Sequence, residues 1–235
     1  MIVHEFILDG RPISYVVRRG KSRRRAYLRF NECLDLEVVL PRNCDSCAAE
    51  ILEKSRSWIR KRYTELSQIR ECRTSGKMMH WGEMRSMETM PADDGVSDVS
   101  VVADSIVLRL ASGSDARTEL KQWMMKEAAT YVSGCLPSLA DGLGVEYGRV
   151  LVRDVRSRWG SCSRKKNLGF NYRLMMLPPD VAEYLLLHEL AHIREFNHSK
   201  RFWETVATAC PNYREKEKKL SGYPPGLELP FLSTA

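Results

Sequence analysis

Three of the five histidines in the chain lie within eleven residues, at positions 188, 192 and 198, and Glu189 directly follows the first of them. Residues four apart share one face of an α-helix, so His188 and His192 can offer two imidazole nitrogens to one zinc ion. Zinc lowers the pKa of a bound water toward about 7, and Glu189 can take a proton from that water. These residue types at this spacing predict a zinc-dependent hydrolase with Glu189 as its base and one zinc ion per chain.

The third zinc ligand must come from a segment that turns back after this helix. We expect His198 in this role, with Asn197 in the left-handed conformation that ends a helix and lets the chain reverse. Glu204 is the competing candidate, because one large branch of such hydrolases takes a glutamate from a following helix. The metzincin subclass is disfavoured, since Glu195 stands where its glycine would and no methionine follows Met176.

A closed structural zinc site is the alternative to an open catalytic one. A fourth protein ligand such as Cys162 or Cys210 would leave no position for water. Such a site has no need for Glu189, whereas hydrolysis requires a base at this place. The open site is therefore the favoured interpretation.

The histidine motif should lie on a buried helix that spans about 179–196. Residues 181–187 are almost wholly apolar, as expected of a helix that is buried on most sides. Pro179 in the first turn and Asp180, which can cap free amide groups, favour a start there. The helix therefore presents one polar face to a cleft.

The segments on either side of this helix should support it. Residues 145–152 predict a strand, and 158–174 predict a hairpin whose turn is at 164–167. Its edge can pair with an extended peptide, as in other zinc peptidases. Three of its side chains either line the cleft or pack the hairpin on the helix: Trp159, Asn171 and Arg173. After the motif, Ser199 can cap a further helix that places two structural aromatics under the site, Phe202 and Trp203.

The amino-terminal part of the chain predicts a β-rich structure. Residues 1–40 alternate apolar and polar side chains in short runs, with Asp9-Gly10 as a hairpin signal. Apolar residues then recur at helical spacing over 45–70, and 76–113 predicts more short strands. The antiparallel strands expected before the helix span about 2–8, 12–19, 25–31 and 34–40.

Several ordered motifs in the second half of the chain resemble the YgjP-like metallopeptidase family, most strongly over 145–220. These motifs are Arg158-Trp159-Gly160-Ser161-Cys162-Ser163, Asn171-Tyr172-Arg173-Leu174, Pro178-Pro179, His188-Glu189-Leu190-Ala191-His192, Asn197-His198-Ser199, Phe202-Trp203 and Pro211-Asn212-Tyr213-Arg214. The resemblance implies a compact zincin domain, distantly similar to SprT-type proteases that act on proteins attached to DNA. It also implies three histidine ligands and a glutamate base, which map onto His188, His192, His198 and Glu189.

The chain is thus predicted to have an α+β fold. An antiparallel β-rich subdomain with an amphipathic helix spans 1–113, a zincin-like metallopeptidase domain spans 114–222, and a carboxy-terminal tail spans 223–235. Ser112-Gly113-Ser114-Asp115 marks the boundary, because glycine and capping residues interrupt the pattern there and apolar residues then recur at helical spacing.

Composition limits the class of protein. The chain has 235 residues, of which 43% are hydrophobic and 29% charged, enough to bury an ordinary core. Its start lacks the features of a signal peptide, and no run approaches the length of a membrane span, so a cytoplasmic location is expected. Seven scattered cysteines are an odd number and do not suggest a disulfide framework.

The positive charge of the chain does not decide which partners it binds. The formal charge is +7, and residues 18–25 contain a basic cluster that would attract nucleic acid, although a solvated hairpin end explains it as well. A peptidase acting on protein or peptide substrates is the leading function. A metal-dependent hydrolase of nucleotide phosphoanhydrides is the first alternative. A nucleic-acid-associated module with a structural zinc is the second.

Overall fold

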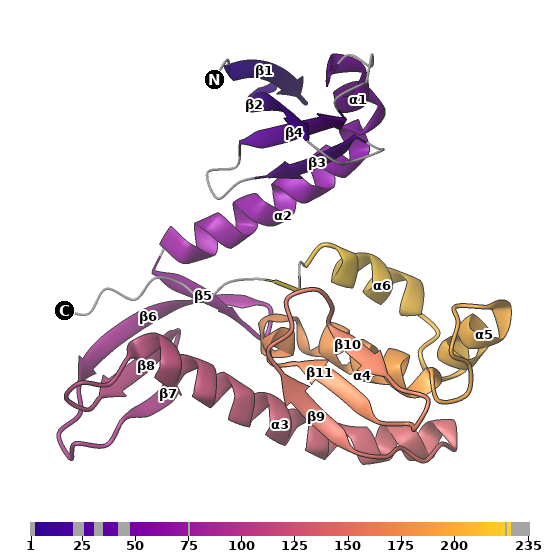
Figure 1. Ribbon diagram of the computed structural model, residues 1–235. Helices are drawn as coiled ribbons and strands as arrows, with labels where there is room; N and C mark the ends of the chain where they lie inside the picture. Colours follow the sequence, from indigo (N-terminus) through magenta and orange to yellow (C-terminus); the bar gives the residue numbers. More distant parts are fainter. Residues whose placement is uncertain are drawn as a thin grey trace. The chain divides into compact units, whose positions relative to one another are not determined.

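The computed structural model describes residues 3–20, 26–30, 35–41, 48–74, 76–223 and 225–226. The chain has an α+β fold and forms two compact units, Met1–Arg70 and Glu71–Ala235 (Figure 1). Among the described residues, no helix has the length and apolar character needed to cross a membrane. Outside the described residues lie 21–25 of the basic cluster, three of the cysteines and most of the predicted tail 223–235.

The first unit contains one four-stranded sheet in the order β1-β2-β4-β3. Asp9 and Gly10 form the turn between β1 and β2 with φ angles of 52° and 80°, as the Asp-Gly signal predicts for a tight hairpin. The strands lie close to the predicted ranges. They are β1 (Val3–Leu8), β2 (Arg11–Gly20), β3 (Tyr27–Phe30) and β4 (Leu36–Pro41).

The sheet of the first unit is not wholly antiparallel, which corrects the prediction. β2 and β4 pair in parallel. Between them in sequence comes β3, which pairs with the other edge of β4 in the antiparallel sense. β4 is therefore a central strand, and its residues Leu36 and Val38 are fully buried. The predicted single helix over 45–70 is divided at Ser55 into α1 (Ala48–Lys54) and α2 (Arg56–Thr74). Leu52 and Ile59 from these helices join the core of the unit.

The second unit begins earlier than the predicted boundary at residue 113. Its first sheet has the order β5-β6-β8-β7 and packs on the long helix α3 and on the turn η1. Trp81 donates its backbone N–H to the carbonyl of Met175 at 2.6 Å, and the ring of His80 lies 5.6 Å from that of Trp123. These contacts join the sheet to the second unit. The elements are β5 (Lys77–His80), β6 (Glu83–Pro91), β7 (Asp98–Val102), β8 (Ser105–Leu110), α3 (Ala116–Leu143) and η1 (Tyr172–Met176).

The long helix α3 contacts several elements of the second unit, and both of its ends are capped. Asp115 accepts from the backbone N–H of Thr118 at the start, and Gly144 adopts the left-handed conformation at the end. Leu120, Met124, Ala128 and Val132 are buried at intervals of four residues. This apolar face packs against α4 and η1.

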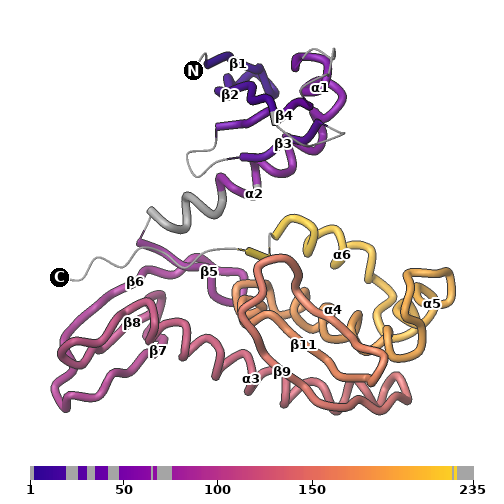
Figure 2. Tube along the Cα trace, in the orientation of Figure 1, coloured from indigo at the N-terminus to yellow at the C-terminus, as the bar shows by residue number. Residues whose placement is uncertain are grey.

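The remaining elements surround the histidine helix α4. A three-stranded sheet has the order β10-β11-β9, in which β10 and β11 form the predicted antiparallel hairpin and β9 pairs with β11 in parallel. The β10 strand lies next to α4, both of which Figure 1 labels, and Figure 2 traces the chain in the same orientation. These elements are β9 (Val150–Arg153), β10 (Gly160–Cys162), β11 (Leu168–Asn171), α4 (Pro179–Ala191), α5 (Lys200–Ala209) and α6 (Tyr213–Ser221).

Candidate metal centre

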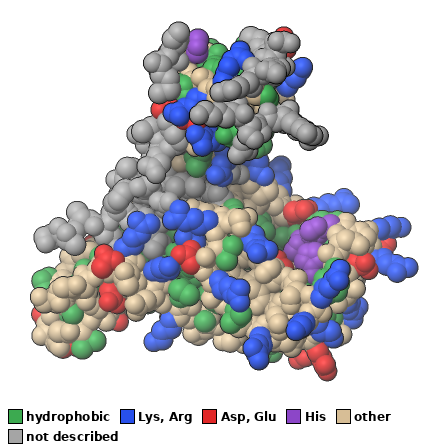
Figure 3. All heavy atoms as spheres, in the orientation of Figure 1, with side chains coloured by type: hydrophobic (Ala, Val, Ile, Leu, Met, Phe, Trp, Pro, Cys, Tyr) green, Lys and Arg blue, Asp and Glu red, His purple; other side chains and the backbone are tan. Residues whose placement is uncertain are grey.

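The structure brings together the three histidines that the sequence singles out. His188 lies on α4, His192 caps its end and His198 comes from the turn before α5, and one nitrogen of each lies within 4.8 Å of the others. The Nε2 atoms of His188 and His198 are 3.1 Å apart. Figure 3 shows a purple histidine patch on the surface of the second unit. A bound ion would therefore be open to solvent on one side.

The turn that delivers His198 differs from the prediction. The helix α4 ends at Ala191 rather than near residue 196, because Ile193 and Arg194 bond to carbonyls only three residues back. The guanidinium of Arg194 also donates to the carbonyl of Leu143 at the end of α3, which ties down the turn.

Asn197 does not adopt the predicted left-handed conformation, since it is not among the described residues with positive φ. Its Oδ1 instead accepts from the backbone N–H of Ser199 at 3.0 Å. The Ser199 hydroxyl accepts from the backbone N–H of Phe202, so the predicted cap of α5 is confirmed. A side-chain turn and a helix cap thus hold His198 in place.

Oxygen atoms face the outer ring nitrogens of two histidines. His192 Nδ1 lies 3.0 Å from the carbonyl oxygen of Glu195, which can only accept, so this nitrogen carries the proton and Nε2 is left to bind a metal. The hydroxyl of Tyr184 lies 3.4 Å from His188 Nδ1. Such outer contacts orient metal-binding histidines and fix the tautomer.

Aromatic side chains from α5 form the floor of the site. The ring of Phe202 lies 4.5 to 4.9 Å from the rings of His188, His192 and His198. Trp203 stacks on His198 at 5.6 Å. These contacts restrict the rotation of all three imidazoles.

The electrostatics of the cluster fit a divalent cation. Burial, with smaller contributions from the other two histidines, lowers the pKa of His188 to about 3. Burial also lowers the pKa of His192. Both rings are neutral near pH 7 and keep a lone pair for a metal. Two nitrogens bound to one tetrahedral zinc ion at about 2.0–2.1 Å are about 3.3 Å apart. The Nε2 atoms of His188 and His198 are separated by a similar distance, 3.1 Å.

Glu189 follows His188 on α4 and is buried, with 6% of its surface exposed. Burial raises the pKa of Glu189 to about 8, although the nearby charge of Arg158 acts in the opposite direction. The carboxyl group packs against Gly160 of β10, where a Cβ atom would stand 2.6 Å from Glu189 Cγ and 2.7 Å from Cδ. The absence of a Cβ at Gly160 therefore leaves room for the Glu189 carboxyl group, and the sequence alone does not indicate this contact.

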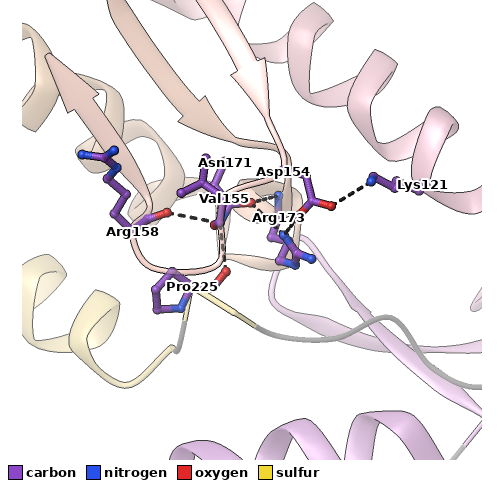
Figure 4. Close-up of polar contacts among 7 residues, drawn as sticks. All are labelled: Lys121, Asp154, Val155, Arg158, Asn171, Arg173 and Pro225. Carbon is purple, nitrogen blue, oxygen red and sulfur yellow. Dashed lines mark hydrogen bonds and ion pairs between the residues drawn. The ribbon is translucent and has the colours of Figure 1, made fainter. Parts of the chain in front are cut away.

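The three hairpin residues with an open role, Trp159, Asn171 and Arg173, each contact other parts of the protein, and Figure 4 draws the contacts of Asn171 and Arg173. The Asn171 side-chain amide donates to the carbonyls of Val155 at 2.6 Å and Arg158 at 3.2 Å, and to that of Pro225 at 2.8 Å. The Trp159 Nε1–H donates to the carbonyl of Tyr223 at 3.1 Å.

Arg173 is the third of these residues, and it pairs with Asp154 at 2.7 Å. Asp154 also pairs with Lys121 at 2.7 Å. Because Trp159, Asn171 and Arg173 are at most 8% exposed, the structure supports the packing interpretation for all three.

The competing ligands lie outside the cluster. Glu204 is exposed, and its carboxylate lies 3.7 Å from Lys200 Nζ. The thiols of Cys162 and Cys210 contact Ser163 and Asn212 respectively. Within the described part of the chain, the group that could hold a metal here contains the three histidines and no fourth ligand. This arrangement fits an open site better than a closed structural one.

Comparison with known proteins gives one family and distant solved structures, among them two metallopeptidase zymogens. The family model of the YgjP-like metallopeptidase domain matches residues 24–223. A search of the curated proteins finds no match. The chain is similar to the crystal structure of the metallopeptidase zymogen of Pyrococcus abyssi abylysin, with 26% identity, a TM-score of 0.36, and coverage of 38% of this chain and 90% of that one. It is also similar to the metallopeptidase zymogen of Methanocaldococcus jannaschii jannalysin, with 21% identity, a TM-score of 0.34, and coverage of 38% and 92%.

Proposed function

Because the chain belongs to the YgjP-like metallopeptidase family, we propose that it hydrolyses peptide bonds with one bound zinc ion. In this proposal His188, His192 and His198 hold the ion. Glu189 is the general base. The observation that carries the proposal is the convergence of three histidine nitrogens within 4.8 Å beside a buried glutamate.

Zinc, when bound, would polarise the scissile carbonyl and make water more acidic. The residues of the chain supply the remaining functions. The positive charges of a bound zinc ion and of Arg158 would favour the ionised form of Glu189, against the effect of burial. A carboxylate oxygen of Glu189 then accepts a proton from the attacking water, and the same carboxyl group returns this proton to the leaving nitrogen. Gly160 and the wall of β10 keep the carboxyl group beside the histidines during both transfers.

The arrangement of protons around the histidines supports this mechanism. The bond between His192 Nδ1 and the Glu195 carbonyl leaves the other nitrogen unprotonated. Phe202 packs against all three rings, and water is thereby excluded from that side of the imidazoles. The open side of the cluster, on which His198 is exposed, is the side from which a peptide must approach.

Product analysis tests the proposed reaction. The full chain, stripped of metal and reloaded with zinc, is incubated with unfolded proteins, defined peptides and nucleoside triphosphates, and the products are identified by mass spectrometry. We expect new peptide termini in the zinc-loaded sample and none in the stripped sample. Release of phosphate or pyrophosphate without any new peptide terminus would instead assign the site to nucleotide hydrolysis.

A further inference from the structure

A strongly basic segment borders the metal centre. Residues 149–166 contain seven basic side chains and one acidic side chain, Asp154. Asp154 is already paired with Lys121 and Arg173, so it does not neutralise the others. The segment covers β9, the loop that follows it and β10, which lies next to α4. Figure 3 shows basic side chains around the histidine patch. The segment therefore carries a net positive charge beside the site, which favours the approach of anions.

Arg158 holds the most specific position in this segment. It lies two residues before Gly160, whose backbone touches the carboxyl group of Glu189. Arg158 therefore lies on the segment that leads into β10, the strand that packs against α4 and the proposed base.

The backbone at Arg158 is fixed while its side chain is not. Its carbonyl accepts from the Asn171 side chain at 3.2 Å, and the next carbonyl, of Trp159, accepts from the backbone N–H of Asn171 at 2.8 Å. The side chain is exposed and points away from Asn171 and Asp154 in Figure 4. Among the described residues no carboxylate pairs with Arg158. A guanidinium on a rigid loop, with its donors unused, is prepared to bind a ligand.

We propose that Arg158 binds a carboxylate of the peptide substrate beside the scissile bond, so that the enzyme prefers acidic peptides. A planar guanidinium can donate two parallel hydrogen bonds to one carboxylate, which gives both affinity and a fixed orientation. The surrounding basic side chains would raise the rate at which acidic peptides arrive. This inference rests on the proposed peptidase function and specifies its substrate class.

Two peptides that differ only in Glu or Gln at the residues next to the cleavage site test the preference. The zinc-loaded full chain is compared with Arg158→Gln and with Lys126→Gln, which removes the same charge from an exposed position on α3, outside the basic segment. We expect wild type and Lys126→Gln to show at least about a tenfold higher kcat/KM for the Glu peptide, equivalent to about 1.4 kcal/mol. Arg158→Gln should lose this preference through a higher KM. An equal preference in all three proteins would overturn the inference.

A binding measurement separates this inference from the proposed function. Fluorescence anisotropy of the labelled Glu and Gln peptides needs no turnover. Tighter binding of the Glu peptide that depends on Arg158, with no cleavage, would support the anion site and contradict the peptidase. Cleavage, together with peptide binding that does not depend on Arg158, would support the peptidase and contradict the anion site. ATP is added as a competitor, and its hydrolysis in preference to the peptide would overturn the assignment to peptide carboxylates. Zinc content and thermal unfolding confirm that each variant is folded.

Discussion

The carboxyl group of Glu189 packs against the backbone of Gly160, so closely that any Cβ atom at residue 160 would lie 2.6 Å from Glu189 Cγ. The two residues come from different elements, α4 and β10, which are adjacent in the second unit. The position of the proposed base therefore depends on the absence of a side chain on the neighbouring strand. This dependence leads to the first prediction.

Gly160→Ala should displace Glu189 without removing the metal ligands. A shift of about 1 Å in a catalytic group can lower the rate about a hundredfold, so we expect a loss of that order in kcat with unchanged zinc content. Gly134→Ala is the control, because this glycine lies inside α3 and its substitution meets no atom within 4 Å. Alanine there should increase stability by about 0.5–1 kcal/mol. Wild-type activity in Gly160→Ala would contradict the role assigned to this contact.

His198→Ala should abolish tight zinc binding, whereas Glu204→Ala should not. A ligand at a thousandfold excess over its Kd stabilises the folded state by about 4 kcal/mol, so chelation should lower the Tm of wild type and of Glu204→Ala. The Tm of His198→Ala should respond little to the chelator. Differential scanning calorimetry with and without chelator gives the comparison. The opposite pattern would make Glu204 the third ligand.

Asn171→Ala should destabilise the second unit. The substitution removes the donor for the carbonyls of Val155, Arg158 and Pro225, and partly buried acceptors are left without a partner. We expect a loss of about 2 to 3 kcal/mol in the free energy of unfolding, measured by urea denaturation. A loss below about 0.5 kcal/mol would show that water replaces the amide at all three carbonyls.

Asp154 should make stability depend on pH in the acid range. Partial burial acts to raise the pKa of Asp154, but hydrogen bonds and ion pairs with Lys121 and Arg173 outweigh it and hold the pKa below its usual value. A carboxyl group with a depressed pKa in the folded state contributes stability that is complete above its unfolded pKa of about 3.9. This stability is lost as the pH falls through the lower, folded pKa.

Urea denaturation at pH 6 and at pH 3 or below measures this effect. Asp154→Asn should be less stable than wild type at pH 6, and the difference between the two proteins should shrink as the pH falls. A difference that stays constant over this range would show that the ion pairs contribute nothing to the titration.

Local patterns in the sequence predict the elements of the fold well. The Asp9-Gly10 turn, the hairpin of β10 and β11 and the cap of α5 at Ser199 all depend on residues close together in the chain, and the structure confirms each of them. The histidines also converge as expected, since two of them are one helical turn apart.

Relations between distant segments are less accessible from the sequence. β2 and β4 pair in parallel because β3 occupies one edge of β4 and leaves the other edge to β2. The alternation of apolar and polar residues does not indicate which edge a strand occupies. The sheet β5-β6-β8-β7 joins the second unit through contacts such as the backbone hydrogen bond from Trp81 to Met175. These two residues are separated by 94 positions in the sequence. The end of α4 likewise depends on Arg194 reaching the last turn of α3.

The central claim is that Glu189 is the base of a zinc hydrolase, and Glu189→Gln tests it most directly. Zinc content and peptide turnover are measured together for wild type, Glu189→Gln and Glu183→Gln, an exposed glutamate on the same helix. We predict about one zinc ion in all three proteins and turnover in wild type and Glu183→Gln, with a loss of at least about a hundredfold in Glu189→Gln. Full turnover by Glu189→Gln, or a wild-type protein that binds no zinc, would contradict the claim.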